Sequence, residues 1–150
     1  MTGQQHIEVR VASSTADMEA ALAVRHEVFV LGQGVPLELE HDEDDAGAVH
    51  VVACDGATVV GTARLTRDGE ARIGRVAVLS SWRRRGIAGM LLAALESEAA
   101  QLGIAEVGLH SQMYVQALYE RHGYTVTGPG FVEAGIDHVP MAKRLDQPAP

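Results

Sequence analysis

Three consecutive arginines followed by a glycine stand at the start of a helical pattern, in the segment Arg83–Ala88. A helix N-terminus presents amide N–H groups without partners in the helix and the positive end of the helix dipole, so it attracts anions. Gly86 allows the backbone to approach a bulky phosphate, and the arginines can form charge-assisted hydrogen bonds. The segment predicts a diphosphate site; taken alone, it also fits an ordinary surface helix that begins at a glycine.

The sequence excludes two other phosphate-binding loops and one class of partner. It contains neither the G-x-x-x-x-G-K-[ST] pattern of a P-loop nor a G-x-G-x-x-G pattern after a first strand. The formal net charge of −8 argues against nucleic acid, whose phosphates require a basic protein surface. Six of the eight residues from Glu38 to Asp45 are acidic. This run either attracts a cationic substrate or is only a solvated loop, and charge alone favours the loop.

Alternating and helical patterns predict one α+β domain with a mixed sheet over residues 6–145. The residues before it, 1–5, are expected to be flexible, and the proline-containing tail 146–150 is expected to be disordered. Asp55-Gly56 predicts a hairpin turn, and a third strand follows Asp68-Gly69, so these strands form an antiparallel meander. The predicted strands cover residues 7–11, 49–54, 58–66, 71–79, 107–109 and 139–145, and the predicted helices cover 14–29, 86–102 and 114–122.

Composition is typical of a globular protein: 47% of the 150 residues are apolar and 21% are charged. Apolar runs are shorter than the roughly 20 residues that a membrane span requires. The first seven residues lack a hydrophobic signal segment, so a cytoplasmic location without membrane association is expected. The single cysteine, Cys54, excludes an internal disulfide and lies in an apolar run, which favours a buried thiol over a nucleophile.

Two motifs resemble those of the GNAT superfamily of N-acetyltransferases. Arg83-x-x-Gly86-x-Ala88, between a strand and an amphipathic helix, is similar to the family's cofactor motif Gln/Arg-x-x-Gly-x-Gly/Ala. The stretch from Gln112 to Tyr124 (QMYVQALYERHGY) is similar to the later motif Asn-x-x-Ala-x-x-Leu-Tyr-Glu-x-x-Gly-Phe. Both motifs occur in the family's order and spacing, and the resemblance spans roughly residues 7–145.

A narrower resemblance is to the ElaA/YjcF-type branch of this superfamily. It rests on the segments 25–30 (RHEVFV), 33–36 (QGVP), 40–45 (EHDEDD) and 133–141 (EAGIDHVPM). The branch usually has Glu-Gln where this chain has Gly32-Gln33, so any role of that glutamate is absent or moved. The resemblance implies a mostly antiparallel sheet of six to seven strands flanked by helices, with two central strands that splay apart.

The resemblance also implies acetyl-coenzyme A as the cofactor. The backbone of the strand Val76–Val78 is expected to pair with the pantetheine arm like an added strand, and the arginine–glycine loop is expected to bind the diphosphate. The cofactor-binding residues implied are Val76, Ala77, Val78, Arg83, Arg84, Arg85, Gly86, Ile87, Ala88, Gly89, Gln112 and Tyr119.

Tyr119 matches the family's tyrosine near the thioester sulfur, where a hydroxyl can protonate the departing thiolate; a core tyrosine is the alternative. Attack on a thioester requires a neutral amine and therefore a base. The candidate bases are Glu27, Asp42, His50, His110, Glu133 and His138. Glu133 and His138 are preferred because they fall in the branch-like C-terminal segment.

Six residues are candidate contacts for the acceptor: Arg25, Phe29, Gln33, Asp42, His50 and His110. Arg25 lies on the apolar stripe of the first helix, so it must be paired; it either anchors the acidic run, which is favoured, or meets substrate. No metal is expected, because the histidines show no paired ligand spacing.

The resulting hypothesis is an acetyl-CoA-dependent N-acetyltransferase. It acts on a primary amine of a small molecule or peptide by direct attack within a ternary complex, because no cysteine or serine nucleophile is evident. The alternative is a non-catalytic coenzyme A-binding sensor or interaction module. The resemblance is also compatible with a homodimer.

Overall fold

The computed structural model describes residues 6–67 and 69–145. The predictions for residues 1–5, for the tail 146–150 and for the turn position Asp68 therefore lie outside the described residues. The strands are β1 (Ile7–Val11), β2 (Val49–Asp55), β3 (Thr58–Thr66), β4 (Arg72–Val78), β5 (Glu106–Gln112), β6 (Thr125–Val126), β7 (Phe131–Glu133) and β8 (Ile136–Arg144). The α-helices are α1 (Thr15–Arg25), α2 (Leu37–Glu40), α3 (Ile87–Gln101) and α4 (Gln116–Arg121). A π-helical segment covers His26–Leu31, and 3₁₀ turns cover Glu43–Gly47, Ser80–Trp82 and Met113–Val115.

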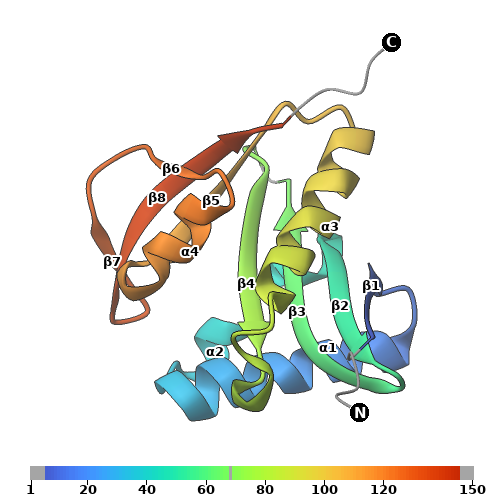
Figure 1. The fold of residues 1–150 in the computed structure, drawn as a ribbon. Helices are drawn as coiled ribbons and strands as arrows, with labels where there is room; N and C mark the ends of the chain where they lie inside the picture. Colours follow the sequence, from blue (N-terminus) through green and yellow to red (C-terminus); the bar gives the residue numbers. More distant parts are fainter. Residues whose placement is uncertain (1–5, 68, 146–150) are drawn as a thin grey trace.

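The strands form one mixed sheet in the order β1-β2-β3-β4-β5-β8-β6, with β7 paired to β8 (Figure 1). Every pairing is antiparallel except that of β4 with β5, so the predicted α+β fold with a mostly antiparallel sheet is confirmed. The sheet has eight strands rather than the six to seven expected. The additional strands, β6 with two residues and β7 with three, are too short to give a readable alternation.

The expected splay of the two central strands is confirmed at β4 and β5. These parallel strands pair only at Arg72↔Gly108 and Ile73↔Leu109, and they separate beyond that point. Arg75 adopts a left-handed backbone conformation with φ of 51°, next to a register shift in the β3–β4 ladder. Such a bulge bends its strand, so it accounts for the divergence of β4 from β5. Figure 1 shows the two halves of the sheet parting below this junction.

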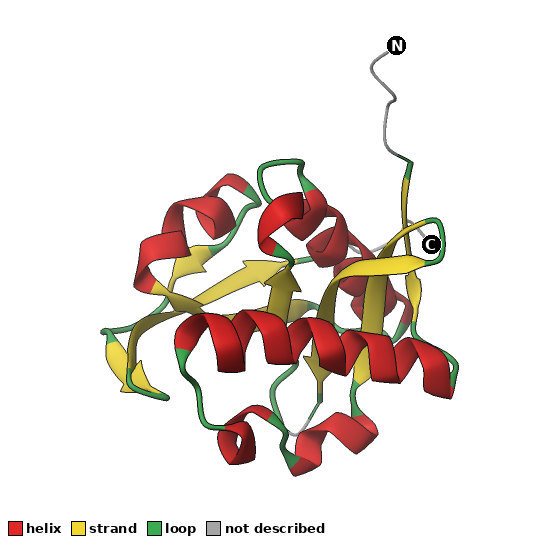
Figure 2. Ribbon diagram, turned by 90° about the horizontal axis from the view of Figure 1, so that it is seen from below, coloured by secondary structure: helices red, strands yellow, loops and turns green. Residues whose placement is uncertain are grey.

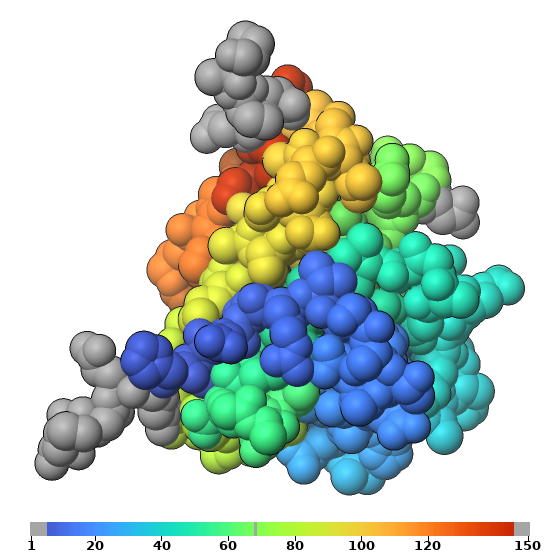
Figure 3. Space-filling view, turned by 90° about the vertical axis from the view of Figure 1, so that its right-hand side faces the viewer, coloured from blue at the N-terminus to red at the C-terminus, as the bar shows by residue number. Residues whose placement is uncertain are grey.

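Helices cover both faces of the sheet (Figure 2). α3 packs its buried side chains on one face, in the main core with Leu65, Val107, Leu109 and Met141. α1 covers the opposite face, where Ala21 packs on Val52 and the buried thiol of Cys54. Viewed from its own side, β1 lies against α3 (Figure 3).

Candidate active site

A cleft of about 960 Å³ opens between the separated strands β4 and β5. Its walls come from segments that are distant in the sequence: the π-helical segment and α2, the loop before α3, α4, and the β7–β8 hairpin. Sixteen of the sequence-predicted site residues line it, namely Val76, Val78, Arg83, Arg84, Gly86, Ile87, Ala88, Gly89, Gln112, Tyr119, Glu133, His138, Phe29, Gln33, Asp42 and His110.

The loop before α3 presents several hydrogen-bond donors to the cleft. Arg84 and Gly86 both have left-handed backbone conformations, with φ of 63° and 78°. The first intrahelical hydrogen bond runs from the Met90 amide to the Gly86 carbonyl, so the amides of residues 86–89 have no acceptor within the helix. Arg83 and Arg84 line the cleft beside these amides, and neither has a carboxylate partner among the described residues. This arrangement suits a diphosphate.

The edge of β4 that faces the cleft is free of a neighbouring strand. The Leu79 amide donates to the Val60 carbonyl of β3, and the N–H and C=O of successive residues of a strand point to opposite edges. The N–H and C=O groups of Val76 and Val78 therefore point toward the cleft. In agreement with this direction, the Arg83 side chain donates to the Val78 carbonyl across 3.2 Å. The amide of Val76 is left as a donor that faces the gap.

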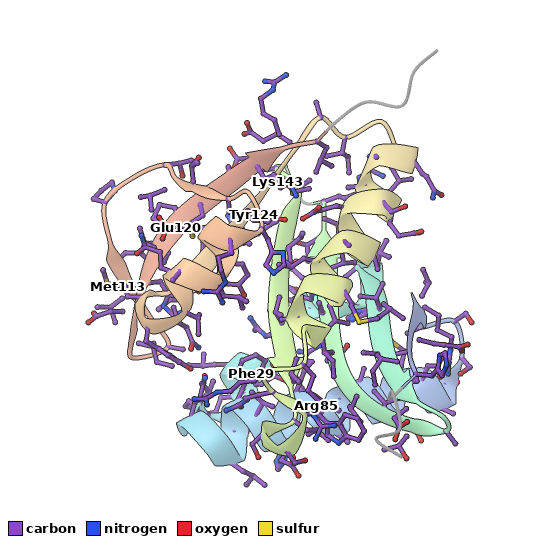
Figure 4. All side chains as sticks on the ribbon, viewed as in Figure 1. Phe29, Arg85, Met113, Glu120, Tyr124 and Lys143 are labelled. Carbon is purple, nitrogen blue, oxygen red and sulfur yellow. The ribbon has the colours of Figure 1, made fainter. Side chains whose placement is uncertain are left out.

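Tyr119 projects from α4 toward the same gap and is only 8% exposed. Burial raises the pKa of its phenol to about 12. Its ring packs edge-to-face on Tyr124, with centroids 6.0 Å apart. The Tyr124 hydroxyl donates a hydrogen bond to Glu96 on α3, and Lys143 of β8 donates to the same carboxylate. These three residues join the two halves of the sheet at the closed end of the cleft, where Figure 4 labels Tyr124 and Lys143. No described residue hydrogen-bonds the Tyr119 hydroxyl, which leaves this proton available to a ligand.

Glu133 lies between two histidines on the opposite wall. His110 Nδ1 is 3.2 Å from Glu133 Oε1, and His138 Nε2 is 3.8 Å from Glu133 Oε2. His138 Nδ1 lies 2.7 Å from the Ile136 carbonyl and must donate to it, so Nε2 carries the lone pair of the neutral ring. Phe131 stacks on His138 and meets His110 edge-on, which fixes both rings. A carboxylate oxygen and an imidazole lone pair thus converge on one point without a donor of their own.

A hydrogen-bonded bridge crosses the opening of the cleft. The side-chain amides of Gln33 and Gln112 exchange hydrogen bonds of 2.9 and 3.1 Å, and Gln33 also donates to the Tyr114 hydroxyl. Gln33 follows the π-helical segment, whereas Gln112 and Tyr114 come from the end of β5 and the turn after it. The bridge therefore joins the two walls. Phe29, labelled in Figure 4, lies on the first of these walls.

The acidic run is a folded element that pairs with arginines, which corrects the expectation of a solvated loop. Arg25 and Glu40 are each 1% exposed and form a bidentate pair, and Arg25 also contacts both oxygens of Asp45. Buried charges require such compensation, so the arginine fixes α2 and the turn after it. The anchoring role expected for Arg25 is what the structure shows.

Two further arginines complete this ionic cluster, which consists of Arg25, Glu40, Asp42, Asp45, Arg64 and Arg75. Arg64 contacts Asp42 and Asp45 at 2.7 and 2.8 Å, and Arg75 contacts Glu40 and Asp42 at 2.8 and 3.2 Å. Hydrogen bonds from these arginines hold the pKa of Asp42 and that of Asp45 below their usual range, although burial opposes the shift. Asp42 is therefore a poor proton acceptor at neutral pH.

Five of the sequence-predicted residues do not line the cleft, and the candidate base Glu27 is one of them. Arg25 is enclosed in the ionic cluster, and His50 is buried with its Nε2 on the Asp45 carbonyl, so neither faces an acceptor. Ala77 packs under α1, although its strand neighbours face the gap. Arg85 turns away over the Trp82 ring, with the guanidinium carbon 4.7 Å from the ring centroid.

Several lining residues were not predicted from the sequence. They include Arg64, Arg72, Gly74, Arg75, Tyr114 and His122. His122 packs against Gly89, where an added Cβ would lie 2.5 Å from its Cε1, so Gly89 is required for this contact. Strand alternation placed Arg72 and Gly74 on one face, opposite the apolar Ile73, and this signal could have revealed them. No sequence signal indicated the long-range partners of Arg64 and Arg75.

The described residues provide no group of three or more His, Cys, Asp or Glu side chains that could hold a metal ion. Within the same residues, no helix is long and apolar enough to cross a membrane.

Comparison with known proteins gives concordant matches. The model of the acetyltransferase (GNAT) domain family matches residues 10–145. The uncharacterized N-acetyltransferase YjcF of Bacillus subtilis (strain 168) is 38% identical over 135 residues, which cover 89% of this chain and 96% of that protein. Escherichia coli ElaA has a crystal structure with a TM-score of 0.81 at 26% identity, covering 92% of this chain and 99% of that one. A GNAT family acetyltransferase from Elizabethkingia anophelis, crystallised with acetyl-CoA bound, has a TM-score of 0.72 at 17% identity over 95% and 100% of the two chains.

Proposed function

The chain belongs to the GNAT acetyltransferase family, and from that premise we propose that it transfers the acetyl group of acetyl-CoA to a primary amine. The acceptor is a small molecule or a peptide, and its nitrogen attacks directly within a ternary complex. The observation that carries this proposal is the convergence of Glu133 Oε2 and His138 Nε2, 3.8 Å apart, in the same cleft as the free edge of β4. Two acceptors without a donor between them suit an ammonium or amine group.

The cofactor fits the residues present. Arg83, Arg84 and the free amides of residues 86–89 hold the diphosphate, while the cleft-facing edge of β4 pairs with the amide-bearing arm. Acetyl-CoA supplies an activated acetyl thioester. The neighbour from Elizabethkingia anophelis binds acetyl-CoA on the same fold, which supports this assignment.

Three sets of groups assist the reaction: one removes the proton of the amine, one stabilises the developing negative charge, and one protonates the thiolate. Glu133 and His138 bind the amine and remove its proton, and His110 orients Glu133 through Nδ1. The amide of Val76 faces the place where negative charge develops on the thioester oxygen. Tyr119 protonates the departing thiolate; its pKa of about 12 keeps the phenol protonated throughout the neutral range.

Thiol release from acetyl-CoA, measured over a broad panel of primary amines, tests the proposal. Tyr119→Phe and Glu133→Gln are each expected to lower kcat about 10²- to 10⁴-fold while acetyl-CoA binding by calorimetry persists, because loss of a general acid or base has effects of this size. Glu120→Gln is the matched control, since Glu120 is exposed on α4 and does not line the cleft. Acetyl-CoA binding without thiol release for any amine would reject the transferase and favour a coenzyme A-binding module.

A further inference from the structure

Among the described residues, the cleft contains an arginine near Glu133 and His138 that has no carboxylate partner. Arg25, Arg64 and Arg75 are paired with Glu40, Asp42 and Asp45 in the ionic cluster. Arg72, at the start of β4, lines the cleft and is exposed. Among the described residues it has no ion pair and no side-chain hydrogen bond, so its guanidinium is available to a ligand.

The sheet directs Arg72 toward the acceptor rather than toward the cofactor loop. Ile73 and Leu109 are buried in the core under α3, so their neighbours Arg72 and His110 lie on the opposite face of the sheet. Arg72 is registered with Gly108 of β5, and His110 is two residues further along that strand. The two Cα atoms are therefore separated by about 5 Å across the strands and about 7 Å along them. His110 contacts Glu133, so Arg72 lies on the same face as the groups that receive the amine.

A hollow lies between the free arginine and the amine-binding pair. Gly74 provides no side chain there, and a Cβ built at Gly74 meets no atom within 4 Å. A planar guanidinium binds a carboxylate through two parallel hydrogen bonds, and it does so more specifically than an ammonium does. The hollow thus has a cationic group at one side and an anionic group at the other.

We propose that the acceptor is an amino acid, a molecule with both a carboxylate and the reactive amine, and that Arg72 binds its carboxylate. This inference rests on the proposed acetyl transfer, since it names the class of acceptor for the same site. The ammonium group faces Glu133 and His138 while the carboxylate faces Arg72. Polyamines fit this side less well, because three of the carboxylates in the acidic run are already paired with arginines.

Matched pairs of acceptors test the carboxylate directly. L-phenylalanine is compared with phenethylamine, L-tryptophan with tryptamine and L-leucine with isoamylamine, so that each pair differs only in the carboxylate. At least one amino acid is expected to have a kcat/KM about 10-fold or more above that of its amine. Arg72→Gln is expected to lower kcat/KM for that amino acid about 10- to 100-fold, mainly through KM, and to change the matched amine less than two-fold. Arg72→Lys is expected to recover part of the loss.

Controls separate this inference from the proposed function and from misfolding. Arg67→Gln removes a cation from the end of the same β3–β4 connection, but Arg67 is not in the cleft, so both members of a pair should be unaffected. Equal use of amine and amino acid, or an equal loss on both in Arg72→Gln, overturns the inference. If no amine releases thiol, calorimetry of the same amino acids with the coenzyme A complex still decides it: Arg72-dependent binding supports the carboxylate site, and absence of binding rejects it.

Discussion

The two sides of the cleft use arginine in opposite ways. On the cofactor side, Arg83 and Arg84 are exposed and lie beside unpaired backbone amides, so their positive charge faces the ligand. On the acceptor side, Arg25, Arg64 and Arg75 are each bound to two carboxylates of the protein. The first set is available to bind the proposed cofactor, whereas the second holds the acidic run in place. Residue type alone therefore does not distinguish a binding arginine from a structural one. The number of protein carboxylates in contact with the guanidinium distinguishes them.

The largest expected effect concerns the enclosed arginine. Arg25→Met is expected to lower the free energy of unfolding by about 3–5 kcal/mol, because it leaves the buried Glu40 carboxylate with one partner fewer. Urea unfolding followed by circular dichroism measures the change. Arg84→Met, on the exposed loop, is the matched control and should remain within about 0.5 kcal/mol of the unsubstituted protein. A comparable loss in both variants would contradict the division between structural and binding arginines.

An intermediate effect is expected for the cofactor loop. The double variant Arg83→Ala/Arg84→Ala should weaken acetyl-CoA binding about 10- to 100-fold, because charge-assisted hydrogen bonds contribute about 1.5–3 kcal/mol. Calorimetry with acetyl-CoA and with acetyl-pantetheine, which lacks the diphosphate, distinguishes the mechanism. The weaker binding of acetyl-pantetheine should not change further in the variant. An equal loss for the two ligands would place the arginines elsewhere than on the diphosphate.

The smallest effect concerns backbone strain, which occurs on both sides of the cleft. Ala134 has a φ of 51° in the β7–β8 turn, and Arg84 has a φ of 63° in the loop before α3. Asparagine tolerates this conformation better than either residue, so Ala134→Asn and Arg84→Asn should each stabilise the fold by about 0.5–1 kcal/mol. Only Arg84→Asn should also weaken acetyl-CoA binding. No gain in melting temperature for either variant would show that the surrounding contacts, rather than φ, set the stability.

The cofactor side was largely predictable from the sequence because its determinants are local. The helix start at Gly86 and the adjacent arginines are contiguous, and the helix boundary follows from a change in periodicity near this glycine. The predicted central strand and its splay were also confirmed. The bulge at Arg75 had no local signal, because a left-handed arginine is disfavoured by its own conformational preference. Contacts with α2, about 35 residues earlier, stabilise it.

The acceptor side depends on contacts between distant residues, and sequence patterns reveal these poorly. The acidic run was correctly identified as charged, but its pairing with Arg64 and Arg75 depends on how β3 and β4 pass beneath it. Two short strands, β6 and β7, were missed for lack of length. Glu133 and His138 were selected by resemblance to a branch of the family, whereas their convergence depends on the β7–β8 hairpin register. Site residues in this half remain proposals that the experiments above address.

The two-pair junction between β4 and β5 has a consequence for how such a chain diversifies. The first half, β1 to β4 with α3, contains the arginine–glycine loop, and the second half, β5 to β8 with α4, contains Glu133 and His138. Few backbone hydrogen bonds couple the halves, so insertions or substitutions in the second leave the ladders of the first intact. The narrow seam in the sheet therefore allows one half to be altered while the strand pairing of the other half persists.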